Sequence, residues 1–274
     1  MTKPLHTPTA PAKPLPPVAF RPRPVSLPRL RIFLFHHAGG SHRFFRGWSP
    51  YFPADWDVVL MEVPGRSVSP GQRPCANLDE VADLFLRHIQ PWTNRPYAFF
   101  GHSMGALVSN ELTRRLRADG HPGPIWLGLS AWSPDHTRLA DRESGRHLLP
   151  DSELRAFLRH VGGTPPEILE SETLWRLFSP AIRNDFRLID TCAPTAYSTV
   201  EDVPQSVFGG KDDTLLPVES LITWADQHPR LTGVHLYRGD HFYLHPHRQE
   251  IVRQITTDIL ATLRETPDSA TTPD

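Results

Sequence analysis

The chain has 274 residues and a formal net charge of −1 at pH 7, and 39% of its residues are hydrophobic. This length is enough to bury a large core within a single domain. A nearly neutral chain lacks the concentrated positive charge with which proteins bind nucleic acid or anionic membranes, so neither is expected as a partner.

The first 28 residues contain nine prolines, which disfavour regular secondary structure. We therefore predict a disordered, Pro-rich N-terminal extension over 1–28, a single domain over 29–265 and a loose C-terminal tail over 266–274. The extension lacks the apolar run of a secretory signal, and no later run approaches the length needed to span a membrane.

From residue 29 onward, short apolar runs alternate with segments of helical periodicity. Alternation of this kind is typical of an α/β fold in which a mostly parallel sheet is flanked by helices. The predicted strands are 31–35, 57–61, 97–100, 125–129, 205–208 and 234–237. The apolar positions of the predicted helices fall within 81–89, 107–116, 218–225 and 251–263.

The alternation stops between residues 130 and 199, where only helical fragments follow one another. We predict fragments over 151–160, 166–169, 171–178 and 181–189. A long insertion directly after a core strand is often functional, which favours a helical lid over about 135–190. Helical padding at the edge of the sheet is the alternative.

The strongest local signal is the Gly-x-Ser-x-Gly pattern around Ser103, which lies between the strand 97–100 and a predicted helix. This is the nucleophile elbow of serine hydrolases, a tight turn that exposes the serine hydroxyl at the carboxyl edge of the sheet. The following helix directs its N-terminal N–H groups to the same place. A serine without a nearby base is a poor nucleophile, so the prediction requires a histidine.

The base and the acid are expected in the loops after the last two strands. His241 follows the strand 234–237, where the Ser…Asp…His order of this fold places the base. Asp212 and Asp213 both follow the strand 205–208, and either carboxylate is suited to orient the imidazole.

The turn after the first predicted strand offers an oxyanion hole. Gly39 and Gly40 let the backbone approach a ligand closely, and the N–H of Ala38 would act with the N–H of Met104, the residue after the nucleophile. We expect His37, Gly39 and Gly40 to contact the substrate, although His37 is equally compatible with a supporting role in the turn.

Other reactive residues are not arranged as sites. Cys75 and Cys192 form neither a disulfide framework nor a ligand spacing, which is typical of the reducing cytoplasm. The fifteen histidines include His36-His37 and the group 241, 245 and 247, but none matches a known zinc motif. We predict no metal and no cofactor.

Several segments together resemble the type II thioesterases, stand-alone α/β hydrolases that accompany non-ribosomal peptide and polyketide synthases. The resemblance extends from about residue 31 to residue 263. It is carried by FHHAGGS at 35–41 with Trp48, VPGR at 63–66, GHSMGA at 101–106, RNDFR at 183–187 and GDHF at 239–242. Two features depart from the family pattern: His36 stands where proline is usual, and the Pro-rich extension is longer.

The resemblance implies a function and a set of roles. The enzyme would release wrong or stalled acyl groups from the phosphopantetheine arm of acyl or peptidyl carrier proteins, acting as a cytoplasmic monomer. Ser103 would be the nucleophile, His241 the base and Asp213 the acid, with Ala38 and Met104 as oxyanion donors. Candidate carrier-docking residues in the lid are Arg155, Arg159 and Arg176. An esterase or lipase acting on small acyl esters or acyl-CoA, and a non-catalytic binding scaffold, are the alternatives.

Overall fold

The computed structural model describes residues 18–66, 73–133, 145–225 and 228–265. Most of the predicted extension (1–17), the predicted tail (266–274) and part of the predicted lid (134–144) lie outside the described residues. The described strands form one sheet whose order is β1-β3-β2-β4-β5-β6-β7. All neighbours are parallel except β1, which runs antiparallel to β3. The predicted α/β fold with a mostly parallel sheet is thus confirmed.

The strands lie close to the predicted apolar runs. Those in the middle of the sheet are buried along their whole length, as expected for parallel strands covered on both faces. Their bounds are β1 Ala19–Phe20, β2 Leu30–Phe35, β3 Trp56–Met61, β4 Tyr97–His102, β5 Leu127–Ser130, β6 Gln205–Gly210 and β7 Leu231–Tyr237.

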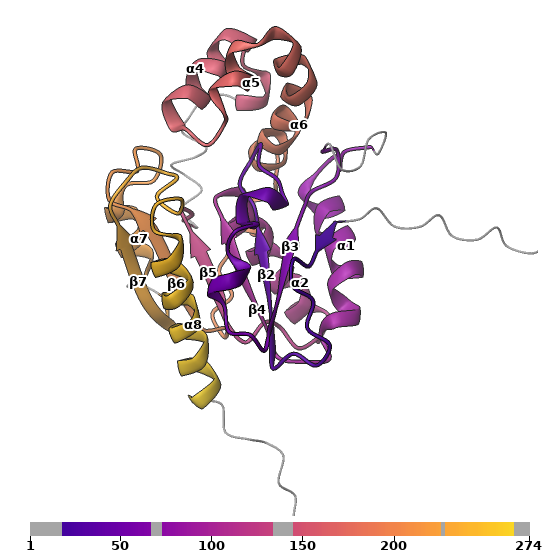
Figure 1. The fold of residues 1–274 in the computed structure, drawn as a ribbon, viewed down its shortest axis with the longest axis vertical. Coiled ribbons are helices and arrows are strands. Elements are labelled where there is room, and N and C mark those ends of the chain that lie inside the picture. The colour runs from indigo at the N-terminus through magenta and orange to yellow at the C-terminus, as the bar shows by residue number, and fades with distance from the viewer. Residues whose placement is uncertain (1–17, 67–72, 134–144, 226–227, 266–274) are drawn as a thin grey trace, which may run out of the picture.

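Helices cover both faces of the sheet (Figure 1). On one face, α1 (Leu78–Ile89), α2 (Met104–Ala118) and α7 (Val218–Ala225) enclose one apolar core. On the other face, α8 (Arg248–Glu265) packs with the 3-10 turns η1 (His42–Phe45) and η2 (Ser49–Tyr51) over a second core. Three further 3-10 turns are η3 (Gln90–Trp92), η4 (Arg146–Leu148) and η5 (Pro194–Tyr197).

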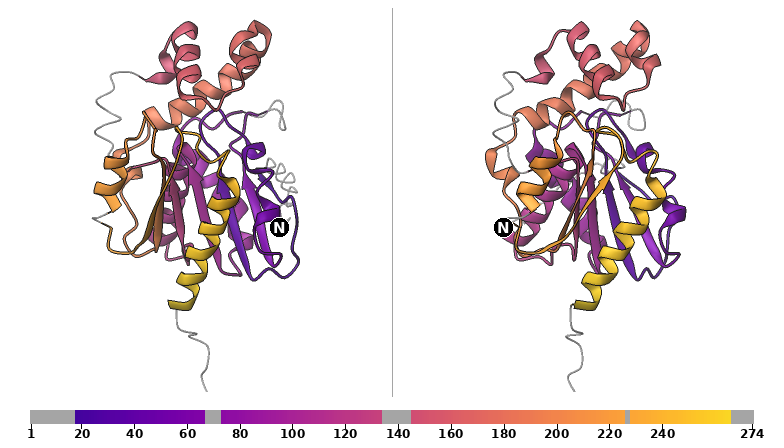
Figure 2. Two further views of the ribbon diagram at one scale, coloured as in Figure 1. Left: turned by 60° about the vertical axis from the view of Figure 1, so that its left-hand side comes forward. Right: turned by 90° about the vertical axis from the view of Figure 1, so that its left-hand side faces the viewer.

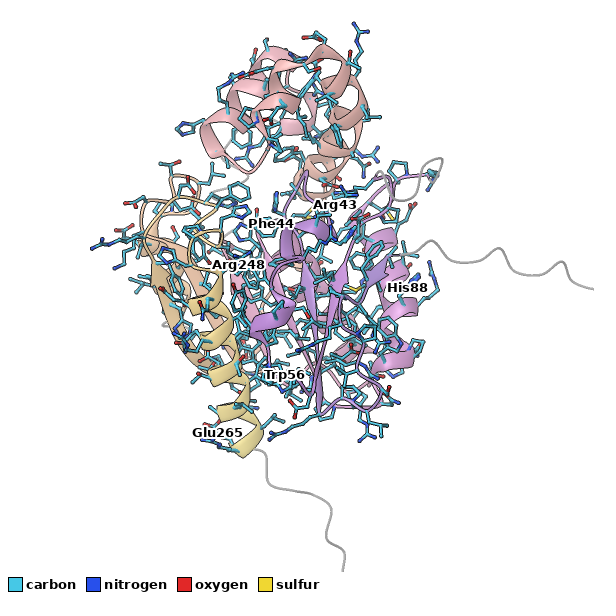
Figure 3. All side chains as sticks on the ribbon, viewed as in Figure 1. Arg43, Phe44, Trp56, His88, Arg248 and Glu265 are labelled. Atoms are coloured by element: carbon cyan, nitrogen blue, oxygen red, sulfur yellow. The ribbon has the colours of Figure 1, made fainter. Side chains whose placement is uncertain are left out.

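The inserted helices α4 (Asp151–Val161), α5 (Pro166–Glu170) and α6 (Glu172–Asp190) stand together above one end of the sheet. The two rotated views in Figure 2 keep them at that same end. They share a third apolar cluster that includes Leu154, Leu158 and Trp175. We call α4, α5 and α6 the cap. Figure 3 shows Arg43 and Phe44 of η1 at the end of the sheet that faces the cap, with Trp56 at the opposite end.

Two predictions about local structure are wrong. The proline-rich segment before residue 29 contributes β1, in which Ala19 pairs with Met61 and Phe20 with Leu60. Proline is tolerated at a sheet edge, and two residues between Pro17 and Pro22 are enough for an edge strand. The buried Asp57 anchors this edge through an ion pair with Arg21 at 2.7 Å.

The second error concerns α6, which is one helix where two fragments were predicted. Pro180 lies inside it and removes one backbone hydrogen bond. Pro180 is exposed, so water can reach the carbonyl that loses its donor. The apolar face of α6, which buries Trp175 and Ile182, offsets this cost and keeps the helix continuous.

Candidate active site

The turn around Ser103 has the backbone geometry of a nucleophile elbow. Ser103 joins β4 to α2 with φ 55° and ψ −117°, a strained conformation for a residue that is not glycine. A Cβ on Gly101 would lie 2.1 Å from the carbonyl oxygen of Gly105, and a Cβ on Gly105 would lie 2.1 Å from that of Phe35. Both glycines are therefore needed for the turn to pack against the end of β2.

His241 and Asp213 meet in the loops after β7 and β6. His241 Nδ1 lies 2.8 Å from Asp213 Oδ2, and both side chains are buried. Because a carboxylate only accepts hydrogen bonds, Nδ1 carries the proton and Nε2 is left with a free lone pair. Asp213 Oδ1 accepts the N–H groups of Leu215 at 2.8 Å and Leu216 at 3.1 Å.

The structure separates the two candidate aspartates. Asp212 Oδ2 accepts the N–H of Gly239 at 3.1 Å, so its carboxylate ties the two loops together and does not bond the imidazole. A Cβ on Gly210 would lie 2.3 Å from the carbonyl oxygen of Asp240, so glycine lets the loops approach. Asp213 is thus the carboxylate that faces His241.

Ser103 and His241 lie in the same pocket, which has a volume of about 440 Å³. This is within the usual range of roughly 300–1,000 Å³ for small-molecule sites. Ala38 and Met104 line it beside Ser103, and the N–H of Met104 is in the first turn of α2, where it has no acceptor within the helix. The cap contributes Phe157, Leu158, Val161, Phe186 and Ile189.

Of the three residues expected against the substrate, the structure places only His37 in the pocket lining. Gly39 donates its N–H to Asp185 of the cap at 2.7 Å. The carbonyl of Gly40 accepts from Arg66 Nε at 3.1 Å, and its N–H donates to the His37 carbonyl at 3.1 Å. Neither glycine lines the pocket, and these hydrogen bonds hold the turn itself, so the contact of Gly39 and Gly40 with substrate stays a prediction.

Three histidines near the carboxyl ends of β2 and β4 are buried, and burial favours the neutral form of each. Burial lowers the pKa of His37 from 6.5 to about 3, with a further contribution from the nearby His241 and His245. Burial likewise lowers the pKa of His36 and of His102 well below the ordinary value. Phe44 stacks on the ring of His102 at 5.7 Å and meets that of His37 edge-on at 4.5 Å.

These buried imidazoles predict that the protein loses stability in mild acid. The unfolded chain takes up protons below about pH 6.5, whereas folded His37 stays neutral to about pH 3. The unfolded state then binds more protons, so the free energy of unfolding falls by about 1.4 kcal/mol per pH unit for each such histidine. Urea unfolding of the wild type and of His37→Phe between pH 7 and pH 5 measures this fall in the free energy of unfolding.

The His37→Phe variant should show a shallower fall, smaller by about 2 kcal/mol between pH 6.5 and pH 5. His160→Gln, an exposed histidine replacement on α4, is the control. Equal slopes for wild type and His37→Phe would show that His37 is protonated in the folded protein.

The sequence of this chain matches a known protein family. A family model described as a thioesterase domain matches residues 30–259. The chain belongs to the thioesterase family. This thioesterase is 34% identical to the gramicidin S biosynthesis protein GrsT of Aneurinibacillus migulanus over 229 residues, which are 83% of this chain and 88% of GrsT.

Solved structures of proteins from biosynthetic pathways also resemble this chain. The crystal structure of ClbQ from the colibactin NRPS/PKS pathway matches this thioesterase with a TM-score of 0.77 and 27% identity, covering 87% of this chain and 100% of ClbQ. The type II thioesterase BorB from the borrelidin biosynthetic cluster matches with a TM-score of 0.75 and 29% identity, covering 90% and 99%. The resemblance to type II thioesterases is confirmed.

Cys75 is a buried free cysteine. Burial raises the pKa of the Cys75 thiol to about 11, which disfavours the reactive thiolate. Within residues 18–66, 73–133, 145–225 and 228–265, no group of three or more His, Cys, Asp or Glu side chains could hold a metal ion. None of the helices in this part of the thioesterase is long and apolar enough to span a bilayer.

Two polar residues, Arg66 and Asp185, have roles that the sequence alone did not indicate. Both fall in segments that carry the family resemblance, but no local pattern indicated that they meet. Arg66 donates a short hydrogen bond to Asp185, whose side chain is fully buried. Together they bind the backbone of the turn after β2.

Proposed function

We propose that this chain is a type II thioesterase that hydrolyses acyl thioesters from the phosphopantetheine arm of carrier proteins in a peptide or polyketide synthase. The observation that supports the proposal is one pocket lined by Ser103, by His241 and by side chains of the cap, in a thioesterase-family chain whose His241 Nδ1 lies 2.8 Å from Asp213. Relatives named for gramicidin S, colibactin and borrelidin formation support the substrate class.

In the proposed mechanism, His241 removes the proton of Ser103 as the Ser103 oxygen attacks the thioester carbonyl. The negative charge on the carbonyl oxygen is stabilised by the N–H groups of Ala38 and Met104. The thiol of the arm leaves with a proton from His241. Water activated by the same imidazole then releases the acid and restores Ser103. Asp213 holds the imidazole and stabilises its charged form.

We also propose that the cap is the lid of the site. Its side chains line part of the pocket that Ser103 also lines, and Phe157 and Phe186 make that part apolar. An apolar pocket separates acyl chains that differ by one methylene by only about 1–3 kcal/mol. Short and medium acyl groups should therefore be accepted with little discrimination, as removal of varied stalled groups requires.

The arginines of the cap differ in their availability to a carrier. Arg155 binds Glu172 at 2.7 Å and lies over the Trp175 ring at 4.7 Å, so its guanidinium already has partners within the cap. Arg159 and Arg176 are exposed. We therefore retain Arg159 and Arg176 as the carrier-docking residues. We also propose that the enzyme is cytoplasmic and monomeric and that it needs no cofactor.

An acyl group on its carrier should be hydrolysed faster than the same group on free pantetheine, and this preference should shrink as salt screens the docking charges. Intact-mass analysis of one carrier loaded with a panel of acyl groups measures the first rate, and thiol release measures the second. Replacing Arg159 and Arg176 with alanine should lower kcat/KM on the carrier by about threefold to tenfold, since each exposed pair contributes up to about 1 kcal/mol.

The control for this experiment is Arg264→Ala. Arg264 is exposed near the C-terminal end of α8, which Figure 3 shows at the end of the molecule remote from the cap. If free acyl-pantetheine is hydrolysed equally well at low salt, carrier docking is wrong. If an oxygen ester of equal chain length is the better substrate, the enzyme is an esterase.

A further inference from the structure

The oxyanion turn, residues 36–40, is held by two buried side chains from different parts of the fold. The first is His36, which belongs to the turn itself, and the second is Asp185, which comes from α6 of the cap. They bind the two peptide units on either side of Ala38. The direction of the Ala38 N–H depends on how these two peptide planes are oriented.

His36 fixes the peptide unit that joins His37 to Ala38. Its Nε2 lies 3.3 Å from the N–H of Val63, just after β3. A backbone N–H can only donate, so Nε2 accepts and the ring proton is on Nδ1. Nδ1 then donates to the carbonyl of His37 at 2.7 Å. Burial lowers the pKa of His36 well below its ordinary value, so the ring stays neutral and keeps this arrangement.

The His37 carbonyl and the Ala38 N–H belong to one planar peptide unit and point in opposite directions. Holding the carbonyl against His36 therefore directs the N–H to the other side. The N–H of Gly40 also donates to this carbonyl, at 3.1 Å. The N–H that would stabilise the oxyanion is thus aimed by bonds made to the opposite end of its own peptide unit.

Asp185 fixes the next peptide unit, which joins Ala38 to Gly39. Its Oδ2 accepts the Gly39 N–H at 2.7 Å and also binds Arg66. Arg66 Nε donates to the Gly40 carbonyl at 3.1 Å, so the two members of the ion pair bond successive residues of the turn. Gly39 has φ +76°, and a Cβ on it would lie 3.2 Å from Cγ1 of Ile182. The helix α6 therefore meets the turn through the hydrogen bond between Gly39 and Asp185 and through the apolar cluster of Ile182, against which Ala38 packs.

We infer that His36 and Asp185 are positioning residues that aim the Ala38 N–H at the oxyanion. They act through the backbone and touch no reacting atom. Because Asp185 belongs to the cap, the direction of the Ala38 N–H also depends on the position of α6 against the turn. This inference rests on the proposed function only in taking Ala38 as an oxyanion donor.

The test uses His36→Phe, which keeps a ring of similar size and removes both hydrogen bonds, and Asp185→Leu, which keeps a branched side chain of similar size and removes the acceptor of the Gly39 N–H. An oxyanion donor must lie within about 2.7–3.1 Å of the oxygen, and a misplacement of about 1 Å can cost about 100-fold in rate. We expect kcat for a p-nitrophenyl ester to fall about 10- to 100-fold in each variant, with KM within about twofold. His36→Asn, whose amide replaces Nδ1 as donor, should recover part of the loss.

A second measurement separates positioning from a structural role. A trifluoromethyl ketone forms a tetrahedral adduct whose oxyanion occupies the same hole, so its Ki should rise by about the factor by which kcat falls. His228→Phe is the matched control. His228 is also a buried imidazole that bridges two backbone groups, the carbonyl of Val200 and the N–H of Arg230, each at 3.3 Å, but it lies before β7 at the other edge of the sheet.

His228→Phe should lower the melting temperature and leave kcat and Ki unchanged. If His36→Phe and Asp185→Leu behave like this control, they are structural residues and the inference is overturned. Should one variant fail to fold, the other still decides. The ester assay requires no carrier, so loss of carrier preference would overturn the proposed substrate while the expected kcat and Ki changes would still support the positioning role.

Discussion

Replacing Ser103 with alanine should abolish thioester hydrolysis, with kcat lower by about 10⁵- to 10⁶-fold, as expected when the nucleophile of such a triad is removed. The fold should survive. Alanine adds no atoms to the tight turn, and the Ser103 N–H still donates to the Ser130 carbonyl at 2.8 Å. Turnover of acyl-pantetheine by thiol release, together with thermal unfolding followed by circular dichroism, measures both outcomes.

The matched control is Ser109→Ala, six residues further along the chain in α2. Ser109 is buried and donates to the Ala106 carbonyl at 3.0 Å within its own helix. Its removal should change kcat by less than about twofold, because serine-to-alanine changes in a helix act on stability and not on the pocket. Residual turnover within tenfold of wild type in Ser103→Ala would contradict the nucleophile assignment.

The part of the candidate site that could be predicted from the sequence depends on short-range patterns and one rule of topology. The elbow requires a strand, two glycines and a helix within a few residues, and each has a local signature. Parallel strands end at one edge of the sheet, so residues after β4, β6 and β7 had to come together there. This rule placed Ser103 and His241 in one pocket although they are far apart in the chain.

What the sequence could not predict depends on contacts without a local signature. Asp185 and Gly39 are 146 positions apart, and no periodicity or spacing links them. The choice between Asp212 and Asp213 depends on how a loop folds within one residue. The edge strand β1 and the helix that continues through Pro180 both arise because tertiary contacts outweigh the local preference of proline.

The two aspartates after β6 should respond differently to the same change. Asp213→Asn should lower kcat by about 10⁴-fold, the effect expected when the histidine of a triad is held in the wrong tautomer. Asp212→Asn should lower it by no more than about twofold to threefold, because the Asp212 carboxylate bonds Gly239 and does not orient the imidazole. An asparagine at 212 can still accept the Gly239 N–H. Circular dichroism should show both variants folded.

The expected loss of kcat in Asp213→Asn follows from the hydrogen bonds to Oδ1, the carboxylate oxygen that does not face His241. Two N–H groups, those of Leu215 and Leu216, donate to Oδ1, so an asparagine would place its oxygen there and turn its NH₂ toward His241. An NH₂ group can only donate, so His241 Nδ1 would have to accept, and the ring proton would move to Nε2. The nitrogen that should remove the Ser103 proton would then already carry one. Equal and mild losses in the two variants would instead show that the His241–Asp213 contact does not set the tautomer of the base.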